Sequence, residues 1–180
     1  DVVAAKREDF SEIRLRNGAR ILLQHDARLP NLHLRVLMQG GPLFEAAGAR
    51  GATALLATLL TKDTRKRTAA EVAAYVESAG GSFYGFSGNN SLGFAVEVLP
   101  SDVERALSVL DEALHAPAFK AATFALERDA QVASLQQDDD DVVAFARRRL
   151  RARFFGSYPL ALDAQGSVAS VSGLTVAHLR

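Results

Sequence analysis

Cysteine and tryptophan are both absent from this sequence of 180 residues, and methionine occurs once. Without cysteine the chain can form no disulfide, and it offers neither a thiolate nucleophile nor a cysteine-based metal site. Long apolar runs are also missing, because no segment approaches the roughly 20 residues that a membrane-spanning helix needs. These absences exclude several kinds of chemistry and a membrane span, but they leave the cellular compartment open.

An excess of charge of either sign is missing too, since 21 lysines and arginines balance 21 aspartates and glutamates. A balanced chain has no net field that attracts nucleic acid or an anionic membrane, so no nucleic-acid partner is expected. Locally, an acidic run at 138–141 precedes five arginines: Arg147, Arg148, Arg149, Arg151 and Arg153. The favoured interpretation is an acidic helix start followed by a solvated basic face, and a polyanion site is the alternative.

What is present describes one ordinary globular domain. Apolar residues make up 48% and charged residues 23% of the chain, and residues 1–180 are long enough for one substantial core. The first residue, Asp1, has no methionine or leader-like segment before it. At the other end, residues 174–180 resemble a helix that is just beginning after Thr175. We therefore expect this domain to be a fragment of a longer chain.

Alternating apolar and polar residues predict five strands in two groups. Residues 13–15 and 20–24 flank Asn17-Gly18, a hairpin signature, and residues 32–38 alternate again. Further on, Ser82–Phe86 and Leu92–Leu99 form a second predicted hairpin. Strands joined by hairpins favour an antiparallel sheet.

Helical patterns fill most of the remaining chain. Residues 48–60 are small or apolar on every side, which predicts a fully buried helix. Capping boxes, Thr68 with Glu71 and Ser101 with Glu104, begin two more helices. Longer helices are predicted at 121–137 and 142–155, and residues 156–173 are interpreted as a loop. The predicted fold class is α+β, with an antiparallel sheet covered on one face by helices.

Short sequence segments along nearly the whole chain resemble the insulinase/pitrilysin family of zinc metallopeptidases, the inverzincins. They are residues 15–18, 40–51, 62–68, 77–81, 98–102, 126–128, 155–159 and 166–168. No single segment is diagnostic, but their order and spacing match the family. The resemblance implies the fold of the metallohydrolase domain found in insulinase and in mitochondrial processing peptidase.

Active members of that family carry an inverted zinc motif, H-x-x-E-H, on the buried helix. The resemblance places Ala54 and Thr58 where the two histidines would be, and Ala57 where the glutamate would be. The third ligand, a glutamate further along, falls at or beside Gln136. Alanine and glutamine cannot replace imidazole and carboxylate ligands of zinc. We therefore predict no catalytic residue, no metal and no cofactor in this chain, with zinc expected in a partner domain.

Other chemistries find less support in the sequence. His25 and His33 are placed on strands joined by a short turn, and a metal shared between them is kept as a remote alternative. No G-x-S-x-G motif positions a serine nucleophile. The isolated acids Glu45, Glu77 and Glu97 are interpreted as solvated or capping carboxylates.

The resemblance implies a metal-free domain from the second half of a bacterial two-unit member, which helps to wall a proteolytic chamber. The full-length protein would then be a zinc metallopeptidase. The partner of this domain would be another insulinase-like domain or subunit that carries the zinc, and the protein would be periplasmic or secreted. Peptides would add as a strand beside Tyr84, Gly85, Phe86 and Ser87. The alternative for this segment is an ordinary strand whose Phe86 fills the core. The alternative for the domain is a peptide-binding or assembly scaffold with no link to proteolysis.

Overall fold

The computed structural model describes residues 10–26, 28–41 and 43–179, and the chain divides after Pro30 into two compact units. The first unit holds an antiparallel hairpin of β1 (Ser11–Arg14) and β2 (Arg20–Leu23). In its turn, the Asn17 side chain accepts a hydrogen bond of 3.0 Å from the Ala19 N–H, and Gly18 has a φ of 86°. The hairpin predicted around Asn17-Gly18 is therefore confirmed.

The second unit is built on a three-stranded antiparallel sheet. Its strands are β3 (Leu32–Gln39), β4 (Ser82–Ser87) and β5 (Ser91–Val98), in the spatial order β3-β5-β4. Side chains of β3 alternate between half-buried and exposed, as its alternating sequence predicts. The central strand β5 is almost entirely buried, and β4 lies at an edge of this sheet.

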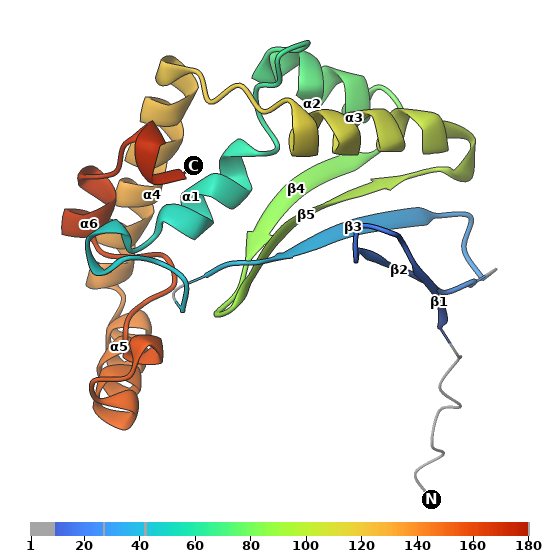
Figure 1. Ribbon diagram of the computed structural model, residues 1–180. Helices are drawn as coiled ribbons and strands as arrows, with labels where there is room; N and C mark the ends of the chain where they lie inside the picture. The colour runs from blue at the N-terminus through green and yellow to red at the C-terminus, as the bar shows by residue number, and fades with distance from the viewer. Residues whose placement is uncertain (1–9, 27, 42, 180) are drawn as a thin grey trace, which may run out of the picture. The chain divides into compact units, whose positions relative to one another are not determined.

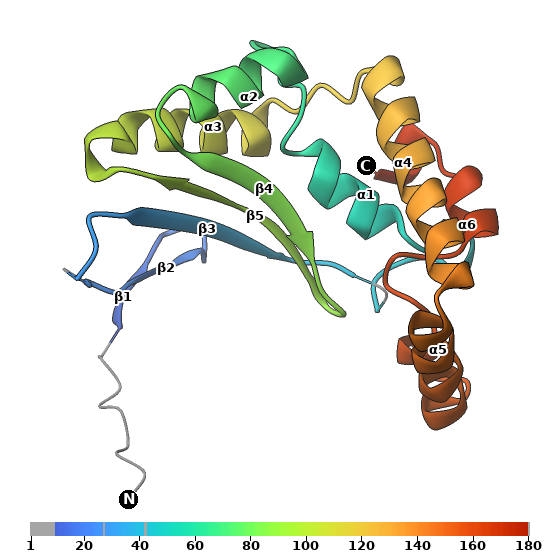
Figure 2. The ribbon, with the colours of Figure 1, turned by 180° about the vertical axis from the view of Figure 1, so that it is seen from behind.

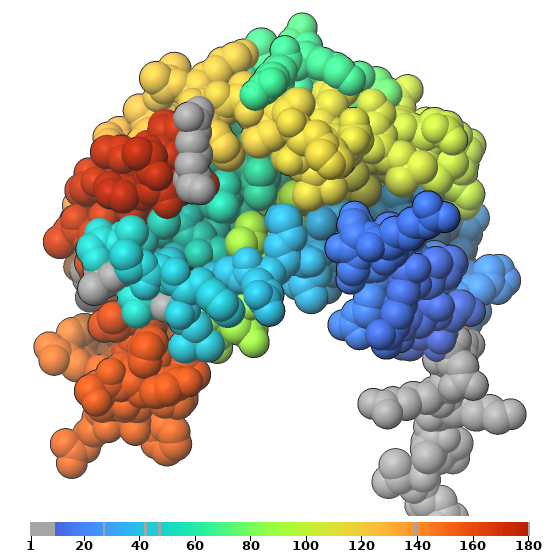
Figure 3. Space-filling model, in the orientation of Figure 1, coloured from blue at the N-terminus to red at the C-terminus, as the bar shows by residue number. Residues whose placement is uncertain are grey.

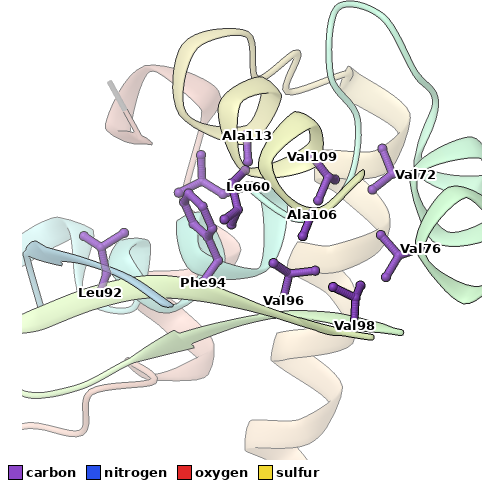
Figure 4. Packing of buried hydrophobic residues seen from close by; sticks show 11 residues of the cluster. Leu60, Val72, Val76, Leu92, Phe94, Val96, Val98, Ala106, Val109 and Ala113 are labelled. Atoms are coloured by element: carbon purple, nitrogen blue, oxygen red, sulfur yellow. The ribbon is translucent and has the colours of Figure 1, made fainter. Parts of the chain in front are cut away.

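Two helices cover one face of the sheet and complete the first hydrophobic core (Figures 1 and 4). They are α2 (Ala69–Glu77) and α3 (Val103–His115). Phe94 and Val96 of β5 are fully buried against Val72 and Val76 of α2 and against Val109 of α3. The capping box at the start of α2 is confirmed, because Thr68 and Glu71 exchange side-chain and backbone hydrogen bonds.

A second core joins the buried helix to the C-terminal part of the chain. Helix α1 (Ala52–Leu59) packs against α4 (Ala121–Asp140) and near α6 (Val168–Ser172), as both ribbon views show (Figures 1 and 2). Leu55 and Leu59 of α1 meet Phe124 and Leu135 of α4 there. Helix α1 therefore lies between the sheet and α4, and the α+β fold with helices on one face of the sheet is confirmed.

Helix α5 (Val142–Phe155) differs from the other long helices because none of its residues is buried. In the space-filling view it projects from the rest of the second unit (Figure 3). The Asp141 carboxylate caps its N-terminus by accepting hydrogen bonds from the N–H groups of Val143 and Ala144, at 2.7 and 2.9 Å. None of the helices in the described part of the chain is both long and apolar enough to cross a bilayer.

Two local predictions need correction. Ser101 and Glu104 form no capping box, because a 3-10 turn at Pro100–Asp102 precedes α3 and the Ser101 hydroxyl donates to Asp102 instead. The segment 156–173, predicted to be a loop, contains a 3-10 turn at Pro159–Ala161 and the short helix α6. The C-terminal segment forms a further 3-10 helix, Val176–Leu179, after Thr175.

Candidate functional site

Helix α1 is held at its N-terminus by a buried carboxylate. The Glu45 side chain is 4% exposed, and its two oxygens accept hydrogen bonds from the backbone N–H groups of Thr53 and Gly51, at 2.7 and 3.2 Å. A carboxylate satisfies the unpaired N–H groups of a first helical turn and interacts favourably with the helix dipole. The interpretation of Glu45 as a capping carboxylate is thus confirmed.

The three positions that the family resemblance assigns to the inverted zinc motif lie on this helix. Ala54 and Ala57 are buried, at 6% and 2% exposed, and the half-buried Thr58 donates a hydrogen bond of 3.3 Å to the Ala54 carbonyl. Two methyl groups and one hydroxyl that is bonded to its own helix provide no imidazole or carboxylate ligand. The residues present do not fit a zinc ion.

Thr58 opens onto a hollow of about 250 Å³ between α1 and α4. Glu127, Gln131 and Ser134 of α4 line the same hollow, and they recur at the spacing of one helix face. The Glu127 carboxylate forms an ion pair of 2.9 Å with Lys62, and the Gln131 side chain donates to the Gly51 carbonyl at 3.2 Å. These contacts fix α4 beside α1.

Gln136, the sequence candidate for the third ligand position, does not line this hollow. It is exposed on α4, two residues beyond Ser134, and two residues turn a helix by about 200° to the opposite face. Ser134 and Leu135, which flank the candidate on its N-terminal side, lie at the hollow with Thr58. The structure thus brings Thr58 together with Ser134 rather than with Gln136.

Metal ligands are also lacking elsewhere in the described residues, where no three His, Cys, Asp or Glu side chains gather in a metal-binding arrangement. His33 lies on β3, with Nε2 at 3.7 Å from the Glu97 carboxylate of β5. His25 follows β2, so the expectation that both histidines lie on strands is wrong for His25. The two histidines belong to different units of the chain.

The candidate peptide-binding segment, Tyr84 to Ser87, occupies the outer strand β4 directly beside α1. A Cβ added to Gly85 would lie 1.9 Å from the Ala57 carbonyl oxygen, so glycine allows the strand to cross the helix at the motif position. In the described sheet β4 pairs with β5 alone. One edge of β4 is therefore without a strand partner in the second unit.

The side chains of β4 alternate between the two faces of the sheet. Phe83 packs into the core, where its ring meets that of Phe94 at 5.9 Å. Phe86 lies on the opposite face, with the Arg35 guanidinium 4.1 Å from its ring centroid, and Tyr84 on the same face is 40% exposed. The expectation that Phe86 helps to fill the core is therefore wrong. Successive side chains of a strand point to opposite faces of the sheet, and on β4 it is Phe83 that points into the core.

Sequence reasoning missed a buried polar network at the C-terminal end of α1. Asp63 is 5% exposed; its carboxylate accepts hydrogen bonds from Thr123 and from the Ala69 N–H, and it pairs with Lys120 at 3.1 Å. Burial by itself raises the pKa of Asp63, but these donors outweigh it and hold the pKa below its usual value. Asp63 thereby ties α1 to the starts of α2 and α4.

A second buried acid lies next to this network. The Glu112 carboxylate of α3 accepts a hydrogen bond of 3.0 Å from Thr64 and pairs with Arg67. The dense polar sequence at residues 62–68 is the one local signal of this network. Acids that are buried with partners are structural more often than catalytic.

A three-stranded antiparallel sheet covered by helices, with the buried helix α1 between the sheet and α4, defines the class of the protein as an α+β domain. The family model described as Insulinase (Peptidase family M16) matches residues 20–166. The chain therefore belongs to the insulinase family of peptidases.

Curated relatives agree with this assignment. An uncharacterized zinc protease of Mycobacterium leprae is 27% identical over 98% of this chain and 40% of its own length. A probable mitochondrial-processing peptidase subunit beta of Arabidopsis thaliana is 24% identical over 89% of this chain and 30% of its own length. The chain thus spans less than half the length of these relatives.

Solved structures share the fold. A peptidase M16 inactive domain from Pseudomonas fluorescens matches 95% of this chain and 42% of its own, with a TM-score of 0.87 and 21% identity. A protease from Helicobacter pylori matches 96% of this chain and 42% of its own, with a TM-score of 0.88 and 17% identity.

Proposed function

We propose that this chain is a noncatalytic, chamber-forming domain of a zinc metalloendopeptidase. One observation carries the proposal: α1 keeps its position between β4 and α4, but its motif positions hold Ala54, Ala57 and Thr58. A domain that preserves the scaffold of a metal site without its ligands is suited to architecture rather than to hydrolysis. The likeness to a structure described as an inactive domain supports the same conclusion.

Zinc would then be supplied by another insulinase-like domain, either in the same polypeptide or in a second subunit. The lengths of the relatives support this arrangement, because the chain spans only 40% of the Mycobacterium leprae zinc protease. The remaining length of such proteins is sufficient for at least one more domain of this size. This domain would contribute a wall of the chamber and would not contribute a ligand.

The free edge of β4 is the proposed contact for substrate. A peptide that adds as a strand gains backbone hydrogen bonds along the edge, and side chains on the sheet face add selectivity. Tyr84 and Phe86 project on the face opposite the core, and Gly85 lies against Ala57 of α1. An incoming strand would therefore run alongside the former metal helix.

The proposal can be tested by hydrogen exchange of the chain with and without oxidised insulin B chain as an unstructured peptide probe. We expect slower exchange in β4 and unchanged exchange in β3, together with no cleavage of the probe. The double substitution Tyr84→Ser and Phe86→Ser is expected to weaken binding about tenfold, because two aromatic contacts are lost. Its matched control, Leu37→Ser, removes an exposed apolar side chain from β3 on the same sheet face.

Three outcomes would count against parts of this proposal. Protection of β3 instead of β4 would place the peptide elsewhere. An absence of any protection would favour an assembly scaffold without a link to proteolysis. Cleavage of the probe that a chelator abolishes would show that the chain is itself a peptidase.

A further inference from the structure

A further pocket in the described part of the chain lies beside α5, away from β4. It has a volume of about 610 Å³, is open to solvent on one side, and is bordered by α5, by the segment that follows α5 and by the start of α6. One face of α5 forms a wall, because Phe145, Arg148, Arg149 and Ala152 recur at helical spacing. Facing them are residues 161–163 and 166–170, and Leu135 and Arg50 complete the lining.

The lining of this pocket is strongly cationic. Its basic residues are Arg50, Arg148, Arg149 and Arg151, whereas Asp163 is its one acid among the described residues. Arg148 donates to the Asp138 carbonyl at 3.0 Å, and the Arg149 guanidinium lies 5.1 Å from the ring centroid of Phe145. Arg50 pairs with the buried Glu45 carboxylate at 3.9 Å, so Arg149 and Arg151 of α5 carry the positive charge that a ligand would meet at this wall.

Apolar side chains make up much of the remaining lining: Leu135, Phe145, Leu162 and Val168. A volume of about 610 Å³ lies within the range of roughly 300–1,000 Å³ that small-ligand pockets occupy. Guanidinium groups match carboxylates and phosphates, because their planar forks can donate two hydrogen bonds to the oxygens of one head group. The lining therefore favours a ligand with an apolar body and one anionic head.

We propose that this pocket binds a small amphipathic oxyanion, with a single carboxylate or phosphate head directed at the arginines. A long polyanion fits the arrangement less well. Of the five arginines of α5, Arg147 and Arg153 do not line the pocket, so the basic residues do not form one continuous track. The site is separate from the β4 edge and does not depend on the proposed role in proteolysis.

Calorimetric titration of the chain with octanoate tests this proposal. We expect saturable binding that is weakened about tenfold or more by the double substitution Arg149→Gln and Arg151→Gln, since charge-assisted hydrogen bonds are lost. The control, Arg147→Gln with Arg153→Gln, makes the same charge change on the same helix outside the pocket. We expect its affinity to remain within about twofold of the unaltered chain, because salt screens the interaction of a bound ligand with exposed charges outside the pocket.

A second variant keeps every charge. Ala152→Trp fills space at the pocket wall, and because Ala152 is exposed on α5 the helix should tolerate it. We expect this variant to lose octanoate binding while its circular dichroism spectrum stays unchanged. Binding that survives Ala152→Trp would overturn the proposal that the apolar body enters this pocket.

Two further probes define the ligand class. Octanamide has the same apolar body without charge, and inorganic phosphate has the charge without an apolar body; both should bind at least about tenfold more weakly than octanoate. Equal binding of octanamide would identify a purely apolar pocket, and equal binding of phosphate would identify a simple anion site. Each of these two results would overturn the proposal. It would also be overturned if both double variants lost the same affinity for octanoate, or if octanoate showed no saturable binding to the unaltered chain.

Discussion

Helices α1 and α5 differ most in how far their side chains are buried. Six of the eight residues of α1 are buried, whereas none of the fourteen residues of α5 is buried. On α1 lie the positions that the family resemblance assigns to a metal site, and two of them, Ala54 and Ala57, are buried packing groups. Helix α5 contributes little to the core, yet it carries five arginines, and one of its faces lines a pocket of about 610 Å³. Core packing therefore accounts for the sequence of α1, whereas it does not account for the sequence of α5.

Truncation of one leucine on each helix should give the largest contrast. Leu55→Ala in α1 removes a side chain that is 1% exposed in the second core, and we expect the free energy of unfolding to fall by about 3 kcal/mol. Leu150→Ala in α5 removes a side chain that is 69% exposed, so the change should stay within about 0.5 kcal/mol. Urea denaturation followed by circular dichroism measures both. Equal losses would show that α5 is as important to the core as α1.

Replacement of the buried acid beyond α1 should have the next largest effect. Asp63→Asn weakens the bonds to Lys120, Thr123 and the Ala69 N–H, and we expect a loss of about 2 kcal/mol at neutral pH. The control, Asp129→Asn, changes an acid on α4 whose side chain is 67% exposed, and it should alter stability by less than about 0.5 kcal/mol.

The pH dependence provides an independent test of Asp63. Because its folded-state pKa lies below the unfolded value of 3.8, its stabilising contribution is complete above that value. The contribution is lost as the pH falls through the lower folded-state pKa. Unfolding free energies measured between about pH 5 and pH 2 should therefore decline more steeply for the unaltered chain than for Asp63→Asn. Parallel declines would contradict this assignment.

The caps of the two helices should produce the smallest difference. Glu45→Gln weakens the cap of α1 and should lower global stability by about 1 kcal/mol, because α1 belongs to the core. Asp141→Ala removes the cap of α5, and we expect faster amide exchange in its first turn without a change in global stability. Native-state hydrogen exchange separates the two effects. A global loss in Asp141→Ala would show that α5 unfolds together with the core.

Patterns that depend on neighbouring residues could be predicted from the sequence. The uniformly apolar run predicted the buried helix α1, and Thr68 with Glu71 predicted the cap of α2, because these signals lie within one segment. The same reasoning was wrong at Ser101, where Pro100 favours a 3-10 turn that displaces the cap. A local pattern can be overridden by a single residue next to it.

Relations between segments could not be predicted in the same way. Only the pairing of β4 with β5 places Phe83 in the core and Phe86 outside it, since a shift of one residue would exchange them. Likewise, the rotation of α4 determines that Ser134 and not Gln136 shares the hollow with Thr58. The network of Asp63 joins residues 60 positions apart, and the arginine pocket joins Arg50 to residues beyond 134, so a local pattern such as the polar run at 62–68 does not show which residues meet.

The zinc content of the chain tests the central claim most directly: α1 retains the position of a metal helix but has lost its ligands. We would measure zinc bound per chain after dialysis, for the unaltered chain and for a variant with Ala54→His, Ala57→Glu, Thr58→His and Ser134→Glu. We predict no stoichiometric zinc in the unaltered chain and a single bound ion in the variant, with weaker binding when Gln136→Glu replaces Ser134→Glu. Stoichiometric zinc in the unaltered chain, removed by a chelator together with peptidase activity, would contradict the account.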